Sequence, residues 1–271
     1  MTTFLFWNLN KKPLASIIAN LALQHDIDVL MLVECTIPIS VMLKSLNPEG
    51  TAQYFFAPSI GCEKVIIYTR FSPEFLRLVY ETNRLTIREL RLPGLAEILL
   101  AVIHFQSKQH WSDEDQMMEC GPLSASIRKA EDDVQHTRTA LVGDFNMNPF
   151  ETGVISASGL HAVMTREIAS KGSRQVANME FPFFYNPMWS HFGDMNQSPP
   201  GTYYYLGSRP KEFFWHMFDQ VLIRPSLIEF FQHDSLKILS QASEASFLTV
   251  RGLPDKSIFS DHLPILFKLN L

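Results

Sequence analysis

Short apolar runs that end abruptly at a polar residue recur along the chain. They cover residues 4–7, 27–33, 99–103 and 140–142. Runs of this length, rich in Val, Ile, Leu and aromatic residues, are typical of buried β-strands. The polar residues that follow them are Asn8, Glu34, His104 and, after one glycine, Asp144. We therefore expect these side chains at or just past the carboxyl ends of four strands.

Helical spacing appears between the first two of these runs. Apolar residues recur from Leu14 to Ala22, directly after Pro13, and a weaker helical pattern covers residues 123–135. Strand, helix and strand within about 30 residues are typical of a crossover unit that covers one face of a sheet. Further strands are predicted at 65–68, 86–92, 217–223, 236–239 and 264–269. Many strands with few helices predict two packed sheets with helices outside, and no linker divides residues 1–271, which we expect to form a single domain.

Composition and charge narrow the class of protein. Of the 271 residues, 46% are apolar and 19% charged, which is ordinary for a globular protein and excludes a long disordered chain. The 23 basic and 28 acidic residues give a net charge of -5. Proteins that hold a long duplex through its phosphates usually carry a basic excess. Any contact with nucleic acid must therefore come from a local patch or from a metal ion.

The cysteines and the chain ends bear on the compartment. Cys35, Cys62 and Cys120 are odd in number and far apart, so they predict neither a disulfide framework nor a metal knuckle. The apolar run at residues 4–7 is too short for a signal peptide, and no stretch reaches the ~20 apolar residues that cross a bilayer. We expect a cytoplasmic protein without a membrane segment.

More polar residues join the set at strand ends later in the chain, namely Asp219 and the pair Asp261-His262. Each of these residues alone has an ordinary structural explanation, because acids cap helices and close turns, and a lone histidine is often a hydrogen-bonded core residue. Together they would place several acids around one edge of the molecule. Such a concentration of negative charge is unfavourable without a cation.

The order of these motifs resembles the endonuclease/exonuclease/phosphatase superfamily over residues 6–267. The motifs are Trp7-Asn8, Val33-Glu34, His104, Gly143-Asp144-Phe145-Asn146, Asp219-Gln220-Val221 and Ser260-Asp261-His262-Leu263-Pro264. That superfamily includes deoxyribonuclease I-like nucleases, abasic-site endonucleases, inositol-polyphosphate 5-phosphatases and neutral sphingomyelinases. The resemblance implies a four-layer α/β sandwich, with two mixed β-sheets packed face to face, helices outside and a site at one rim.

The types of ligand at the strand ends indicate which metal ion would bind. Glu34, with Asp261 nearby, offers oxygen donors, which favour Mg²⁺ or Mn²⁺ over Zn²⁺. The resemblance implies that Glu34 is the principal ligand and that Asn8 supports the shell around metal and phosphate. Asn10 stands where many abasic-site endonucleases have an acid, so the match to that branch is incomplete.

The resemblance also implies the catalytic roles. Asp144 is expected to orient or deprotonate the attacking water, and Asn146 to donate a hydrogen bond to a phosphate oxygen. His262 would lie against the scissile phosphate, with Asp219 holding its imidazole in the productive tautomer.

A second histidine and its partner are implied by the deoxyribonuclease I-like branch alone. His104 matches a second phosphate-contacting histidine of that branch. Glu63 lies before the predicted strand at 65–68, where that branch has the glutamate that partners this histidine. A Glu63–His104 dyad is therefore expected, although a glutamate before a strand is also common on solvated surfaces.

Aromatic residues are concentrated in residues 181–218, and Tyr203 falls where the family has an aromatic residue beside the catalytic rim. The rings could cover an open end of the sandwich, stack unpaired bases or contact a partner protein. The flanking basic residues could contact phosphates or be ordinary surface charges; they are Arg166, Lys171, Arg174, Arg209 and Lys211.

Three hypotheses follow. The first is a Mg²⁺- or Mn²⁺-dependent phosphodiesterase, most simply a nuclease acting on DNA or RNA. The second keeps the hydrolase chemistry with a phosphoinositide, a sphingolipid or a small phosphoester as substrate. The third is a binding module without turnover that uses its aromatic loops. The sequence does not distinguish DNA from RNA or endonuclease from exonuclease, and it gives no oligomeric state.

Overall fold

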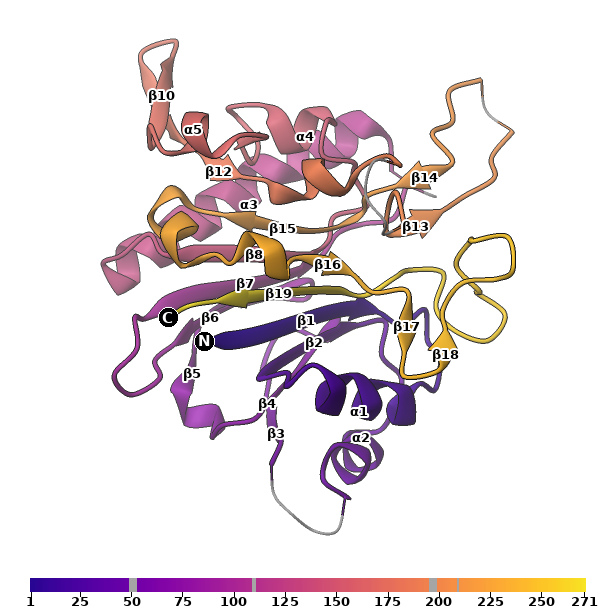
Figure 1. Cartoon of the computed structure of the whole chain (residues 1–271). Helices are drawn as coiled ribbons and strands as arrows, with labels where there is room; N and C mark the ends of the chain where they lie inside the picture. Colours follow the sequence, from indigo (N-terminus) through magenta and orange to yellow (C-terminus); the bar gives the residue numbers. More distant parts are fainter. Residues whose placement is uncertain (49–52, 109–110, 195–198, 209) are drawn as a thin grey trace.

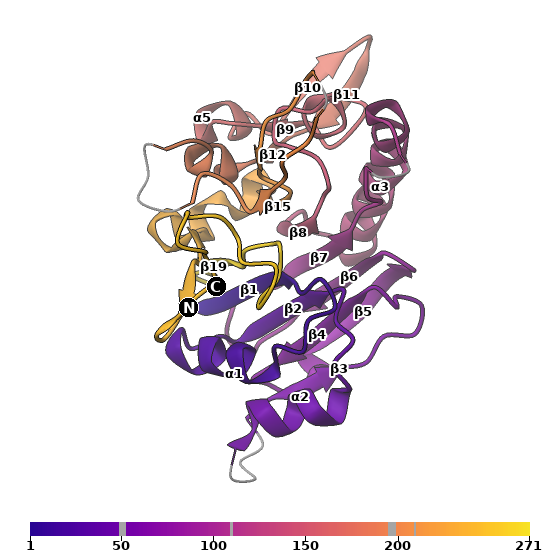
Figure 2. The same ribbon diagram turned by 90° about the vertical axis from the view of Figure 1, so that its right-hand side faces the viewer.

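Two mixed β-sheets lie face to face in the computed structural model, which describes residues 1–48, 53–108, 111–194, 199–208 and 210–271 (Figure 1). Figure 1 shows the strands of both sheets between helices at the top and helices at the bottom, and Figure 2 shows the same arrangement turned by 90°. One sheet has seven strands and the other has six. The predicted four-layer α/β sandwich is confirmed. None of the helices in the described ranges is both long and apolar enough to span a bilayer.

The six-stranded sheet carries the first two predicted strands at its centre. Its order is β16 (Lys237–Ile238), β19 (Ile265–Leu269), β1 (Thr2–Asn8), β2 (Val29–Val33), β4 (Val65–Thr69) and β3 (Phe55–Ala57). β1 runs parallel to β2, with Asn8 opposite Val33. Asn8 and Glu34 therefore leave the sheet side by side.

The seven-stranded sheet brings three more of the predicted residues to the same edge. Its order is β5 (Leu76–Thr82), β6 (Leu85–Leu90), β7 (Ile98–His104), β8 (Thr139–Asp144), β15 (Asp219–Ile223), β12 (Phe184–Tyr185) and β9 (Ala162–Val163). β7 and β8 are parallel with His104 opposite Asp144, while β15 is antiparallel to β8 with Asp219 opposite Asp144.

The helices cover the outer faces of the two sheets. They are α1 (Ala15–Gln24), α2 (Ile39–Leu46), α3 (Asp113–Val134), α4 (Thr152–Ile155) and α5 (Arg166–Ala169), with 3-10 turns at Pro73–Phe75, Pro187–His191, Pro225–Phe230 and His233–Ser235. α1 confirms the predicted first helix. α3 begins ten residues before the predicted start, because its first half is polar and starts from a capping box between Ser112 and Asp115 rather than from an apolar stripe.

The remaining strands form three small hairpins outside the two sheets. They pair β10 (Ser173–Val176) with β11 (Met179–Pro182), β13 (Tyr203–Tyr204) with β14 (Trp215–His216), and β17 (Gln241–Ala242) with β18 (Ala245–Ser246).

The core explains why the strand sequences are apolar without alternation. In β7, Leu100 and Val102 pack in the cluster between the two sheets, whereas Leu99 and Ala101 pack in a second cluster with Ile127 of α3. Successive side chains of a strand point to opposite faces, so a strand covered on both faces is apolar throughout. In β1, β2, β7 and β8 the polar residues are accordingly confined to the strand ends.

Candidate active site

Polar side chains from both sheets meet at the edge where β1, β2, β7 and β8 end and β15 begins. A cleft of about 730 Å³ opens there. Of the predicted site residues, its lining includes Asn8, Glu34, Asp144, Asn146, Tyr203, Asp261 and His262. Asp219 and His104 lie buried close behind these residues. The structure therefore gathers every predicted site residue except Glu63.

Asp144 is buried and held at both carboxylate oxygens. Its Oδ2 accepts a hydrogen bond from Nδ2 of Asn8 at 2.9 Å, and its Oδ1 accepts one from the backbone N–H of Asn146 at 2.9 Å. Asn146 turns back toward Asp144 with a left-handed φ of 50°. Gly143 is required before it, because a Cβ there would lie 2.0 Å from the backbone oxygen of Ile103. The Gly-Asp-Phe-Asn motif thus fixes the direction of one carboxylate.

His262 forms a buried pair with Asp219. Its Nδ1 lies 2.8 Å from Oδ2 of Asp219, whose backbone N–H donates to Oγ1 of Thr202 at 3.1 Å. The other ring nitrogen, Nε2, lies 4.0 Å from Oδ2 of Asp144. Burial alone would lower the pKa of His262, but the carboxylates of Asp219 and Asp144 outweigh it and raise the pKa to about 10. The two carboxylates therefore favour the protonated imidazole, whose Nε2–H can donate a hydrogen bond to an anion.

The backbone around His262 is fixed by residues from the start of the chain. Nε1 of Trp7 donates to the carbonyl oxygen of His262 at 2.8 Å. Oγ of Ser260 donates to the carbonyl oxygen of Asn8 at 2.6 Å and accepts from the backbone N–H of His262 at 3.1 Å. Trp7 and Ser260 thus position this edge of the molecule by joining the two ends of the sequence.

Glu34 and Asp261 present carboxylates to the cleft. The Glu34 side chain is 29% exposed and its backbone has a left-handed φ of 47°. The pKa of Glu34 is lowered, chiefly by a hydrogen bond from His104, whose Nε2 lies 3.5 Å from Oε1 of Glu34, although burial opposes this shift. Across the described ranges, no lysine or arginine forms an ion pair with Glu34, Asp144, Asp219 or Asp261. Carboxylate oxygens that no lysine or arginine neutralises fit a hard divalent cation.

The amide of Asn8 is already engaged at both ends. Its Nδ2 donates to Asp144, and its Oδ1 accepts from the backbone N–H of Asn10 at 2.9 Å. Asn8 therefore acts first as the group that orients Asp144.

A second arrangement of possible ligands lies deeper in the same site. Ligand atoms of Asp144, Asp219 and His262 come within 4.8 Å of one another. Nδ1 of His262 is bonded to Asp219, however, and both oxygens of Asp144 already accept hydrogen bonds. These three residues are better arranged for moving a proton than for holding an ion, and Glu34 and Asp261 remain the more accessible donors.

The expected Glu63–His104 dyad does not form in this structure. Glu63 is exposed and makes neither a hydrogen bond nor an ion pair with His104, whose Nε2 faces Glu34 and Asp144 and whose Nδ1 has no partner in the described part of the chain. The turn before β4 is held instead by Glu81, which accepts hydrogen bonds from the backbone N–H groups of Ile60 and Gly61. Glu63 follows that turn into solvent.

The aromatic-rich segment divides between two roles. Phe183, Phe184 and Tyr185 are buried, as expected for rings that cover the sandwich. Tyr205 and Phe213 instead line the cleft together with Tyr203. Of the flanking basic residues only Lys211 lines the cleft, and Arg209 lies outside the described residues.

The structure adds residues to the cleft that no motif indicated. They include Lys108, Asn148, Glu151, Glu212 and His216. Asn148 lies two positions after the Gly-Asp-Phe-Asn motif. Its closeness to that motif in the sequence was the one signal that could have placed it in the cleft. Glu151 follows in the same loop, whereas Lys108, Glu212 and His216 come from segments that meet only in the folded chain.

Comparison with known proteins rests on structure alone, since no family model matches the chain and no curated protein matches it in sequence. An AP endonuclease from Archaeoglobus fulgidus superposes with a TM-score of 0.58 at 14% identity, covering all of both chains. TDP2 from D. rerio, complexed with a single strand DNA product, gives 0.57 at 14% identity, covering 100% of this chain and 99% of that one. The endonuclease domain of TRAS1, a telomere-specific non-LTR retrotransposon, gives 0.55 at 14% identity with the same coverage. The chain therefore has the deoxyribonuclease I-like fold of the endonuclease/exonuclease/phosphatase superfamily, and the predicted resemblance is confirmed in its fold.

Proposed function

We propose that the protein is a divalent-metal-dependent phosphodiester hydrolase, and specifically a nuclease that cleaves DNA or RNA. The observation that carries this proposal is the buried His262–Asp219 pair, whose free ring nitrogen faces Asp144 in a cleft that also holds Glu34 and Asp261. The endonucleases and the DNA-bound TDP2 that share the fold support the choice of nucleic acid.

A phosphodiester is an anion, so its hydrolysis requires neutralised charge, an oriented water molecule and a stabilised leaving oxygen. Glu34 and Asp261 would hold Mg²⁺ or Mn²⁺, which when bound supplies positive charge to the phosphate and the leaving oxygen. Both residues are oxygen donors that line the cleft, so the residues present fit such an ion.

The protein's own groups orient the water and bind the phosphate. Asp144, fixed by Asn8 and Asn146, presents a carboxylate that orients the attacking water and accepts its proton. Nε2–H of His262 donates to a phosphate oxygen, and Asp219 keeps the ring charged and correctly turned. Nδ2 of Asn146 donates one hydrogen bond to the carbonyl oxygen of Phe105, which lies 3.2 Å away. Its second amide hydrogen is free to donate to the phosphate.

Cleavage of labelled oligonucleotides tests this function. With Mg²⁺ or Mn²⁺ the protein should cleave at least one of single-stranded DNA, duplex DNA and RNA, and a chelator should abolish cleavage. Asp144→Asn should lower the rate ~100-fold or more without changing the unfolding temperature by much. Chelator-resistant cleavage, or full activity in Asp144→Asn, would remove the proposal.

A further inference from the structure

An aromatic hairpin projects from the catalytic edge of the molecule. It consists of β13, β14 and the described residues between them, 205–208 and 210–214, and is called the aromatic arm below (Figure 1). Its backbone begins at the site itself, because Tyr203 forms a β-bridge with His262 and the centres of their rings lie 4.7 Å apart. Tyr203 also stacks on Phe218 at 5.3 Å. The arm is therefore continuous with the surface that would hold the scissile phosphate.

Beyond Tyr203, the arm presents exposed rings to the cleft. Tyr205 is 52% exposed and Phe213 is 42% exposed, and both line the same cleft as Asp144. Nζ of Lys211 lies 5.6 Å from the centre of the Phe213 ring and also lines the cleft. Large rings left open to water beside a catalytic centre usually mark a binding surface.

The arm is held in place before any ligand arrives. Oε1 of Glu212 accepts hydrogen bonds from the backbone N–H groups of Phe213 and Phe214, at 3.0 and 3.3 Å, and lies 3.1 Å from Nε2 of His216. Nδ1 of His216 accepts from Nδ2 of Asn148 at 3.1 Å. Asn148 belongs to the loop that begins with Asp144, so the arm is hydrogen-bonded to the same loop that carries this carboxylate. A surface that is already ordered loses little conformational freedom on binding.

We propose that the aromatic arm is a stacking site for unpaired bases next to the scissile phosphate, and thus that the substrate is single-stranded or locally unpaired nucleic acid. This inference rests on the proposed nuclease function and names its substrate class. Every base has a π-face that can stack on Tyr205 or Phe213 without sequence preference. In a duplex those faces are covered by neighbouring bases, so the rings can reach a base only where pairing is lost.

The charge of the protein favours this form of recognition. The net charge is -5 and Lys211 is the arm's only cation that lines the cleft among the described residues, so few phosphates can be neutralised. A protein that contacts few phosphates must gain affinity from the bases. The competing ligand is a lipid surface, because Leu206 and Phe214 on the arm and Val250 and Ile258 on a separate segment are exposed. Tyr205 and Phe213 line the cleft, however, and this favours a ligand that enters the site.

Binding without turnover tests the proposal. Fluorescence anisotropy of the metal-free full chain in chelator would compare a labelled single strand, the same strand with abasic residues throughout, and the blunt duplex. The single strand should bind most tightly. The double variant Tyr205→Ala/Phe213→Ala should lose about tenfold or more of its affinity for the base-bearing strand and almost none for the abasic strand. Phe214→Ala is the matched control, since that ring is exposed on the same arm and does not line the cleft, and it should bind all three ligands like the unmodified protein.

Several results would overturn the inference. These are equal losses on base-bearing and abasic strands, duplex binding as tight as single-strand binding, or binding to phosphatidylcholine vesicles with none to oligonucleotides. Cleavage assayed in parallel separates this inference from the nuclease proposal. Binding that depends on the rings, without metal-dependent cleavage, would retain the stacking site and contradict the nuclease function. Metal-dependent cleavage with binding that does not depend on the rings would retain the nuclease function and contradict the stacking site.

Discussion

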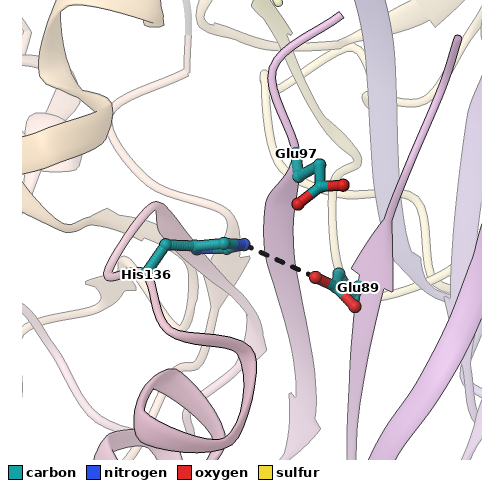
Figure 3. Close-up of side chains that lie close together, drawn as sticks. All are labelled: Glu89, Glu97 and His136. Carbon is teal, nitrogen blue, oxygen red and sulfur yellow. Dashed lines mark ion pairs between the residues drawn. The ribbon is translucent and has the colours of Figure 1, made fainter.

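Two clusters of histidine and carboxylates lie at opposite edges of the seven-stranded sheet. At the catalytic edge, His262 lies between Asp219 and Asp144. At the other edge, His136 faces Glu89 across 3.8 Å, with Glu97 close by (Figure 3). Both clusters bring three possible metal ligands within 4.8 Å, so proximity alone does not distinguish them.

The arginines around each cluster make the difference. Glu89 is buried and paired with Arg77 at 2.6 Å and with Arg91 at 2.9 Å, and Arg91 also lies 3.6 Å from Glu97. Glu34 and Asp261 have no such partners among the described residues. An acid that arginine already neutralises stabilises the fold, whereas an acid left without a basic partner can bind a cation. We therefore expect the arginine-paired acids to stabilise the fold and Glu34 and Asp261 to bind a cation.

The largest expected effect is on activity at the catalytic edge. Glu34→Gln keeps the size of the side chain but removes the charge that holds the metal, and should lower metal-dependent cleavage ~100-fold or more. Circular dichroism and thermal unfolding should show an intact fold. Glu63→Gln is the matched control: because Glu63 does not contact His104, its cleavage rate should stay near that of the unmodified protein. A large loss of cleavage rate in Glu63→Gln would support a Glu63–His104 dyad, which the structure does not form.

A smaller effect, on stability alone, is expected at the opposite edge. Glu89→Gln leaves two arginines without their carboxylate and should lower the free energy of unfolding by about 1–3 kcal/mol. The cleavage rate per folded molecule should be unchanged. Glu97→Gln, which removes a half-exposed carboxylate, should change the free energy of unfolding by less than about 1 kcal/mol in denaturant titrations. The comparison fails if Glu89→Gln abolishes activity in a protein that is fully folded.

The smallest effect concerns pH and His136. Burial lowers the pKa of His136, as do the charges of Arg138 and Arg91, while Glu89 and Glu97 oppose the shift. Its Nδ1 accepts from the backbone N–H of Arg138 at 3.3 Å, as a neutral ring can. The unfolded chain takes up this proton near pH 6.5, before the folded protein does, so stability should fall as pH drops below ~6.5. His136→Gln should reduce that slope in denaturant titrations between pH 7 and pH 5, and an unchanged slope would contradict the assignment.

The central sheets and most of the site could be predicted because their signals are local. Apolar runs covered on both faces mark β1, β2, β7 and β8, and the polar residues that end them meet at one edge because parallel strands end together. The order of motifs was enough to bring His262 and Asp219 into the same site.

The rest depended on packing between distant segments. β5, in which only Leu76 is buried and a bulge at Leu78–Tyr80 interrupts the alternation, and the polar first half of α3 carry little apolar periodicity. The predicted pairing of Glu63 with His104 does not form because the turn before Glu63 is bound by Glu81. That contact spans 20 residues, and no sequence spacing reveals it. The sequence around His216 does not indicate that it lies in the cleft, because its position depends on a hydrogen bond to the distant Asn148.

The position of a bound Mn²⁺ tests the central claim most directly. Crystals soaked in Mn²⁺ and measured at the manganese absorption edge should show an anomalous peak beside the carboxylates of Glu34 and Asp261. A peak among Glu89, Glu97 and His136, or no peak at the catalytic edge at all, would contradict the view that acids without arginine partners mark the site of chemistry.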